Sequence, residues 1–210
     1  MPLVYQQNIN ETTRLGVWHI AESESFFLET VVLAGSITHP HKRLQHLAGR
    51  YLLTVLFEDF PLHLIEIADT RKPFIADETY HFSISHCGDY AAAIVSSNCR
   101  VGVDIEVVSD KTGRLKDKYL TDQEQSLFDD HTPVSASQFY TLMWSIKESM
   151  FKWYGLGAVD FKKHLEVKKL LFDANEFKAN CNFNKDIPRE LNIHGLHFNN
   201  NFLSWVLSRG

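Results

Sequence analysis

The sequence predicts an α+β fold made of two similar halves, each combining helices with an antiparallel set of strands. Short segments rich in β-branched and aromatic residues alternate with turns, which is typical of strands. Two longer stretches, residues 40–57 and 135–154, place apolar residues at three- and four-residue steps, which is typical of amphipathic helices. We therefore expect one half over residues 1–100 and the other over residues 101–210, with helices preceding the strands in each.

Each element is predicted from local residue types. Up to residue 107 we expect helices over residues 22–33 and 40–57, and strands over residues 15–20, 62–68, 81–85, 90–96 and 101–107. Beyond that we expect a short helix opened by a capping box at Thr121–Glu124, a long helix over 135–154 that stops at Gly155, and strands near 161–172, 176–183, 191–198 and 202–207. The similarity of segments 90–95 and 202–207 is our reason for expecting pseudo-symmetry.

Composition and charge limit the possible functions. The 210 residues are 44% hydrophobic and carry a formal net charge of −5. Proteins that bind nucleic-acid backbones are usually basic, so we expect no nucleic-acid partner. No apolar run approaches the roughly 20 residues of a membrane span, and no signal peptide is visible, so we expect no membrane attachment. Three widely spaced cysteines indicate a reducing compartment, and we expect a cytoplasmic protein.

The segment from Val101 to Val107 places two carboxylates on one face of a predicted strand. Side chains alternate along a strand, so Gly102, Asp104 and Glu106 point away from the apolar residues between them. Paired carboxylates suit a hard divalent cation such as Mg²⁺, which also binds phosphate oxygens. The alternative interpretation is a half-exposed strand with a solvated acidic face.

A third carboxylate lies in the long helix over residues 135–154. Glu148 and Lys152 are four residues apart and therefore share a helix face. Glu148 could complete a metal site, and Lys152 could contact a phosphate oxygen. The alternative is a surface ion pair worth only about 0.3–0.5 kcal/mol.

Basic residues in the first half suggest a site for a small anion. The polar side of the helix over residues 40–57 carries a cluster of cationic and titratable residues, namely Lys42, Arg43, His46 and Arg50. Arg71 and Lys72 follow before Pro73, and Ser85 and His86 end a predicted strand. Each of these features alone is more often a solvated or structural one. Their clustering in an acidic protein favours anion binding.

Taken in this order, the motifs resemble the surfactin-synthetase-activating type of 4′-phosphopantetheinyl transferase. The resemblance covers roughly residues 40–155 and rests mainly on Gly-Val-Asp-Ile-Glu at 102–106 and Trp-Ser-Ile-Lys-Glu-Ser-x-x-Lys at 144–152. It implies two pseudo-symmetric halves with coenzyme A and Mg²⁺ bound between them. Arg71 is a departure, because the family has glycine before Lys-Pro.

The resemblance also implies roles for individual residues. The metal ligands would be Asp104, Glu106 and Glu148, and the catalytic residues Glu148 and Lys152. Coenzyme A would be bound by Arg43, Arg50, Lys72, Ser85, His86 and Lys152. Ser85, His86 and Arg50 would contact the 3′-phosphate, Lys72 and Arg43 the adenosine end, and Lys152 the pyrophosphate. Glu124 matches a family glutamate, but its capping box accounts for it.

The implied reaction is transfer of 4′-phosphopantetheine from coenzyme A to a serine of an apo acyl or peptidyl carrier protein, with release of adenosine 3′,5′-bisphosphate. Two alternatives stay open. One is a non-catalytic carrier-protein-binding module of the same fold. The other is a metal-dependent nuclease. The acidic net charge disfavours it, and this chain lacks the lysine that such nucleases have after their second acidic residue, here Glu106. Two halves in one chain make a monomer sufficient.

Overall fold

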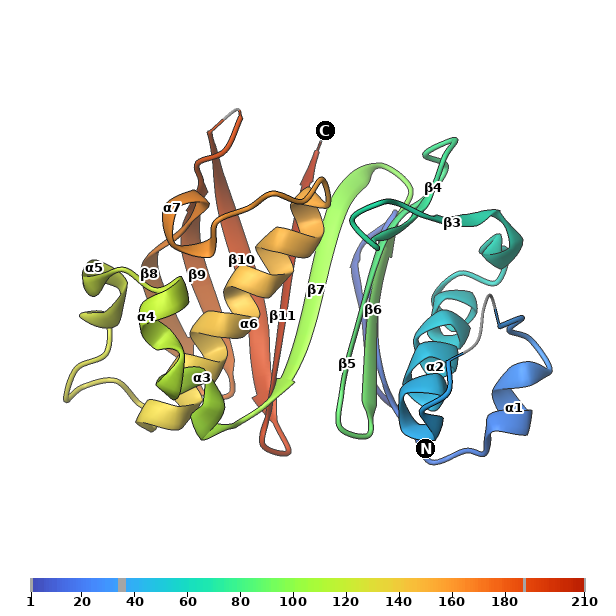
Figure 1. Ribbon diagram of the computed structural model, residues 1–210, viewed down its shortest axis with the longest axis horizontal. Helices are drawn as coiled ribbons and strands as arrows, with labels where there is room; N and C mark the ends of the chain where they lie inside the picture. Colours follow the sequence, from blue (N-terminus) through green and yellow to red (C-terminus); the bar gives the residue numbers. More distant parts are fainter. Residues whose placement is uncertain (1, 34–36, 187, 210) are drawn as a thin grey trace. The chain divides into compact units, whose positions relative to one another are not determined.

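The computed structural model describes residues 2–33, 37–186 and 188–209, and it has the α+β fold that the sequence predicts (Figure 1). Contacts within the chain define two compact units, with the boundary after Val101. No helix among the described residues is long and apolar enough to cross a bilayer.

The first unit is a four-stranded sheet covered by a long helix. Its elements are β1 (Leu3–Asn10), β2 (Thr13–His19), α1 (Glu24–Leu28), α2 (Pro40–Leu56), the 3₁₀ turn η1 (Leu62–Leu64), β3 (Ile65–Ile67), β4 (Pro73–Ile75), β5 (His81–Cys87) and β6 (Tyr90–Ser96). The sheet order is β1-β2-β6-β5, while β3 and β4 form a separate hairpin. Leu47, Leu52 and Leu56 of α2 share a buried core with Trp18 and Val95 of the sheet.

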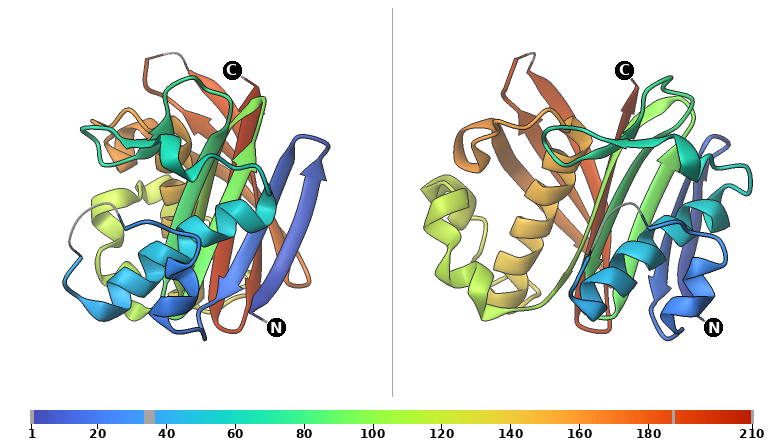
Figure 2. Two further views of the ribbon diagram at one scale, coloured as in Figure 1. Left: turned by 90° about the vertical axis from the view of Figure 1, so that its right-hand side faces the viewer. Right: turned by 45° about the vertical axis from the view of Figure 1, so that its right-hand side comes forward.

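The second unit is a five-stranded sheet packed against α6. Its elements are β7 (Cys99–Val107), α3 (Asp110–Arg114), α4 (Lys116–Tyr119), α5 (Asp122–Gln125), α6 (Ala136–Tyr154), α7 (Phe161–His164), β8 (Leu165–Asp173), β9 (Glu176–Phe183), β10 (Arg189–Phe198) and β11 (Asn201–Arg209). The sheet order is β7-β11-β10-β9-β8, and the right-hand view of Figure 2 shows α6 running along one face of this sheet. Leu142, Ile146 and Met150 of α6 share the core with Val167 and Phe202 of the strands.

The long helices begin and end where the sequence predicts. Pro40 occupies the first turn of α2, and the His39 ring accepts a hydrogen bond from the Lys42 amide. Ser135 and Gln138 form a capping box at the start of α6. Gly155 ends α6 in the left-handed region at φ 75°, which glycine adopts without strain.

Several expected elements need correction. The helix expected over 22–33 covers only Glu24–Leu28, because the β-branched residues that follow have low helix propensity. The strand expected from residue 62 begins as the 3₁₀ turn, and the one expected from 161 begins as α7, which Asp160 caps through the Lys162 and Lys163 amides. The first unit opens with strands β1 and β2, so the expectation that helices come first in each half is wrong.

Candidate active site

Strand β7 and helix α6 touch at Gly102, where no larger side chain would fit. A Cβ atom there would lie 2.1 Å from the Ser149 carbonyl oxygen and 2.6 Å from the Trp153 backbone nitrogen. Both distances are far below van der Waals contact, so glycine allows the helix backbone to lie directly on the strand. This close approach is what brings the carboxylates of β7 next to the polar side chains of α6.

Asp104 is the buried centre of this contact. Its Oδ1 accepts a hydrogen bond from Lys152 Nζ at 2.6 Å, and the two side chains are 2% and 25% exposed. The alternative of a solvated acidic face is therefore wrong for Asp104, although Glu106 at the end of β7 is half-buried. A carboxylate this deeply buried needs a cation, because desolvation of an unpaired charge is costly.

Glu148 lies close enough to both other carboxylates to feel their charges. Burial and repulsion from Asp104 and Glu106 raise the pKa of its carboxyl to about 7, and the charge of Lys152 opposes this rise. The structure thus groups the four charged residues that sequence analysis selected for the metal and the pyrophosphate. The site holds an excess of negative charge, which a divalent cation would relieve.

The chemistry of these side chains fits Mg²⁺, which prefers hard oxygen ligands. As they stand, no three His, Cys, Asp or Glu side chains in the described ranges are arranged to hold a metal ion together. Lys152 instead supplies the cationic charge next to Asp104. The arrangement can therefore bind a cation and a phosphate together, provided that Lys152 exchanges its carboxylate for a phosphate oxygen.

A second ion pair in the same unit, Lys147 with Glu124, is buried. Their side chains are 0% and 1% exposed and approach to 2.7 Å. Lys147 also donates to the backbone carbonyls of Tyr119 and Phe161, and Glu124 accepts from the Val167 amide. The capping box at Glu124 is confirmed. The ion pair through which Glu124 and Lys147 join α5, α6, α7 and β8 was not predicted, because no local pattern distinguishes a buried lysine from an exposed one.

Arg50 in the first unit is a buried cation with no acidic partner among the residues that the structure describes. Arg50 is 9% exposed. Burial lowers the pKa of its guanidinium, and no carboxylate contributes to that shift. Among the described residues no ion pair includes Arg50. Buried charges are normally paired, so an unpaired guanidinium is a candidate anion-binding group.

His46 lies on α2, the same helix as Arg50, and His86 lies on β5. The two elements approach closely because Gly49 leaves room for Ile84, whose Cγ2 would lie 2.6 Å from a Cβ at that glycine. Arg50 and His86 both act electrostatically on His46, whereas His86 itself is exposed. Ser85, the residue before His86, is buried. Ile84 and His86 alternate with Ser85 along β5, and both act on residues of α2.

The other predicted anion-binding residues are arranged differently. Arg43 binds Glu24 of α1 through an ion pair of 2.7 Å, so its guanidinium already has a structural partner. Burial and the nearby charge of Arg100 lower the pKa of Lys72 to about 8. Arg71 lies at φ 66°, a conformation that favours glycine. This conformation gives the physical reason why a glycine suits the position before Lys-Pro.

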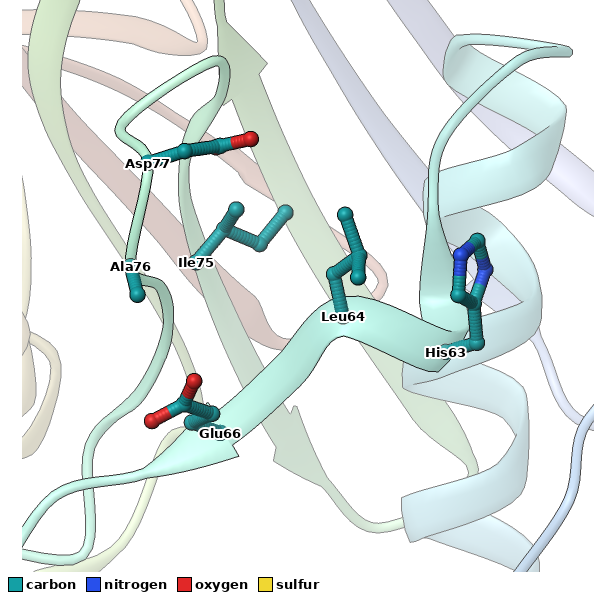
Figure 3. Close-up of a pocket in the computed structure, with 6 residues that line it drawn as sticks. All are labelled: His63, Leu64, Glu66, Ile75, Ala76 and Asp77. Atoms are coloured by element: carbon teal, nitrogen blue, oxygen red, sulfur yellow. The ribbon is translucent and has the colours of Figure 1, made fainter.

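A pocket of about 240 Å³ lies elsewhere in the first unit, between η1, β3 and the end of β4 (Figure 3). It is lined by His63, Leu64, Glu66, Ile75, Ala76 and Asp77, and contains none of the predicted site residues. Its carboxylates, Glu66 and Asp77, would repel a phosphate. The pocket is therefore a poor site for coenzyme A.

Comparison with known proteins decides the family. A family model described as the 4′-phosphopantetheinyl transferase superfamily matches residues 100–206, just over half of the chain, and includes β7 and α6. This chain belongs to that superfamily. Asp104, Glu148 and Lys152 all lie in the matched region.

Individual relatives are similar over about half of their length. Enterobactin synthase component D of Escherichia coli K12 is 36% identical over 114 residues, covering 53% of this chain and 54% of the relative. The 4′-phosphopantetheinyl transferase gsp of Aneurinibacillus migulanus is 30% identical over 130 residues, covering 62% and 52%. A 4′-phosphopantetheinyl transferase of Bacillus subtilis is 32% identical over 92 residues, covering 43% and 41%.

Proposed function

We propose that this transferase moves 4′-phosphopantetheine from coenzyme A to a serine of an apo carrier protein, as a surfactin-synthetase-activating type of enzyme. The observation that carries the proposal is the contact between β7 and α6, where Asp104, Glu148 and Lys152 form one charged cluster. A cluster of carboxylates with a lysine is suited to binding a metal-pyrophosphate group.

In the proposed reaction the serine hydroxyl oxygen attacks the β-phosphorus, and adenosine 3′,5′-bisphosphate leaves. A magnesium ion held by Asp104, Glu106 and Glu148 would neutralise pyrophosphate charge and act as a Lewis acid. Lys152 stabilises the negative charge that grows on the phosphate oxygens. Glu148 would accept the serine proton as the general base.

The first unit would bind the nucleotide end of coenzyme A. Arg50, Ser85 and His86 are assigned to the 3′-phosphate, and Lys72 and Arg43 to the adenosine. The absence of a carboxylate among the groups acting on Arg50 supports the first assignment. The pairing of Arg43 with Glu24 gives the second less support, because a phosphate would compete with a carboxylate already in place.

The test is mass spectrometry of a panel of apo carrier proteins after incubation with the enzyme, coenzyme A and Mg²⁺. A gain of one phosphopantetheine mass on one of them supports the proposal and names the substrate. Coenzyme A binding without transfer would indicate a carrier-binding module. Neither binding nor transfer, together with cleavage of DNA in Mg²⁺, would favour the nuclease.

We also propose a cytoplasmic monomer, whose free cysteines Cys87, Cys99 and Cys181 suit a reducing compartment.

Replacing Arg50 with alanine is expected to raise the KM for coenzyme A roughly 10- to 100-fold, the range for losing a charged hydrogen bond. The 3′-phosphate is remote from the bond that breaks, so kcat should change less. The variant should also lose its discrimination against dephospho-coenzyme A. Steady-state kinetics with both substrates measures this. Lys42→Gln, an exposed cation on the same helix, is the control, and unchanged discrimination by Arg50→Ala would place the 3′-phosphate elsewhere.

The carrier protein is expected to dock on the basic segment that follows β7. This segment forms helices α3 and α4, with Lys111, Arg114 and Lys118 exposed. Lys116 instead packs over the Tyr140 ring at 5.1 Å from its centroid. Its replacement would disturb the helix, so the exposed cations are the better probes of docking.

The double variant Arg114→Glu/Lys118→Glu should raise the KM for an acidic carrier protein, most clearly at low ionic strength, where rim charges set the association rate. The KM for coenzyme A should hardly change. Lys168→Glu/Lys169→Glu on β8, which reverses two other exposed cations, is the matched control. An unchanged carrier KM in the α3–α4 variant at low salt would show that the carrier docks elsewhere.

A further inference from the structure

We infer that His46 is a third ligand of the coenzyme A 3′-phosphate, beside Arg50 and His86, and that it binds this phosphate as the protonated imidazolium. The inference rests on the proposed function, because that function supplies the phosphate monoester. Sequence analysis placed His46 in a cluster that favours anion binding but assigned it no contact with coenzyme A. This role for His46 makes binding of the coenzyme a proton-linked step.

The position of His46 is the first argument. It lies one helical turn before Arg50 on α2, so the two side chains share a face. Its Nε2 atom is buried, and no hydrogen-bond partner for it exists in the part of the chain that the structure describes. Buried polar atoms are nearly always satisfied, so an unsatisfied ring nitrogen on the same helix face as Arg50 is a candidate ligand for an anion.

The surrounding charges are the second argument. The groups that act on His46 are Arg50 on its own helix and His86 on β5. The nearby carboxylates are already engaged. Glu24 on α1 is paired with Arg43, and Asp89 in the turn after β5 accepts from His41 at 3.0 Å. Neither carboxylate is among the groups that act on His46, which therefore experiences a net positive environment.

Protonation follows from these surroundings. Burial, Arg50 and His86 lower the pKa of His46 to about 4, so the ring is neutral at neutral pH in the free protein. A phosphate dianion next to the ring reverses the sign of the local potential and raises that pKa. The binding step is then addition of one phosphate dianion and uptake of one proton from solvent by His46. No bond to phosphorus forms or breaks.

The test is isothermal titration calorimetry of the full chain with coenzyme A, in two buffers that differ in ionisation enthalpy, without carrier protein. At about pH 7, the number of protons taken up per coenzyme A bound should be lower for His46→Gln than for the unmodified protein, by several tenths of a proton. The affinity of His46→Gln should be roughly 10-fold lower near about pH 6.5. The difference should shrink as pH rises, because neither protein then holds the proton. Dephospho-coenzyme A should show no difference in proton uptake.

His41→Asn is the matched control, since His41 is on the same helix but bonds Asp89. It should show the proton uptake of the unmodified protein. A histidine ring titration by NMR gives a second readout that needs no variant at position 46: one ring should titrate near pH 4 in the free protein and at clearly higher pH with coenzyme A bound.

The outcomes separate the two proposals. Coenzyme A binding with equal proton uptake and equal affinity in the unmodified protein and His46→Gln overturns the role of His46 and leaves the proposed function standing. If NMR finds no histidine ring whose pKa rises when coenzyme A binds, the role of His46 is likewise overturned. If the unmodified protein does not bind coenzyme A at all, the proposed function fails, and the role of His46 fails with it.

Discussion

Replacing Asp104 with alanine is expected to lower phosphopantetheinyl transfer by at least about 100-fold, since loss of even an outer-shell partner of a metal costs 10- to 100-fold. The change removes the carboxylate that Lys152 contacts and a proposed magnesium ligand. The fold should persist, because Val103 and Ile105, which belong to the buried core, are untouched. Removing the repulsion from Asp104 should also lower the pKa of Glu148.

The measurement is turnover in saturating Mg²⁺, with circular dichroism and thermal melting as checks of the fold. Asp104→Asn keeps the side-chain shape and should lose activity equally, which separates the charge from packing. Asp122→Asn, an exposed acid at the start of α5, is the control and should keep nearly full activity. Near-normal turnover in Asp104→Ala would show that Asp104 is not a metal ligand.

Replacing Lys147 with methionine is expected to reduce the free energy of unfolding by about 3–5 kcal/mol, the range for breaking a buried ion pair. Methionine fills a similar volume but leaves Glu124 buried with an uncompensated charge. It also leaves the Tyr119 and Phe161 carbonyls without their donor. In a domain of this size the melting temperature should fall by roughly 10 °C.

Thermal and urea unfolding measure this effect. Lys163→Met is the control: its side chain is 79% exposed and lies 3.9 Å from Asp160, so the stability should change by less than about 0.5 kcal/mol. The double variant Lys147→Met/Glu124→Leu should recover part of the loss, because no buried charge is left unpaired. Recovery should be incomplete, since Glu124 also accepts from the Thr121 and Val167 amides. Equal stability of Lys147→Met and the unmodified protein would contradict a stabilising role for the pair.

Local sequence alone determined the elements whose signals are short-range. The capping boxes at Thr121 and Ser135 and the glycine at 155 fix helix ends through hydrogen bonds and dihedral angles within a few residues. Strand alternation likewise placed Asp104 on the face that Gly102 presents to α6. The spacing of apolar residues failed to predict the helix end at residues 29–33. The spacing there is typical of a helix, but β-branched residues follow α1 and the helix stops at Leu28.

Only the tertiary structure decided how each charged residue is used. Glu148 and Lys152 look like a surface pair on one helix, yet Lys152 binds Asp104 on β7. Arg43 and Arg50 lie on one helix, yet Glu24 holds the first while the second is buried without a carboxylate. Lys147 has the same local pattern as any lysine, and its burial depends on Glu124, which is far away along the chain. Burial and charge pairing depend on these non-local contacts, which no window of sequence contains.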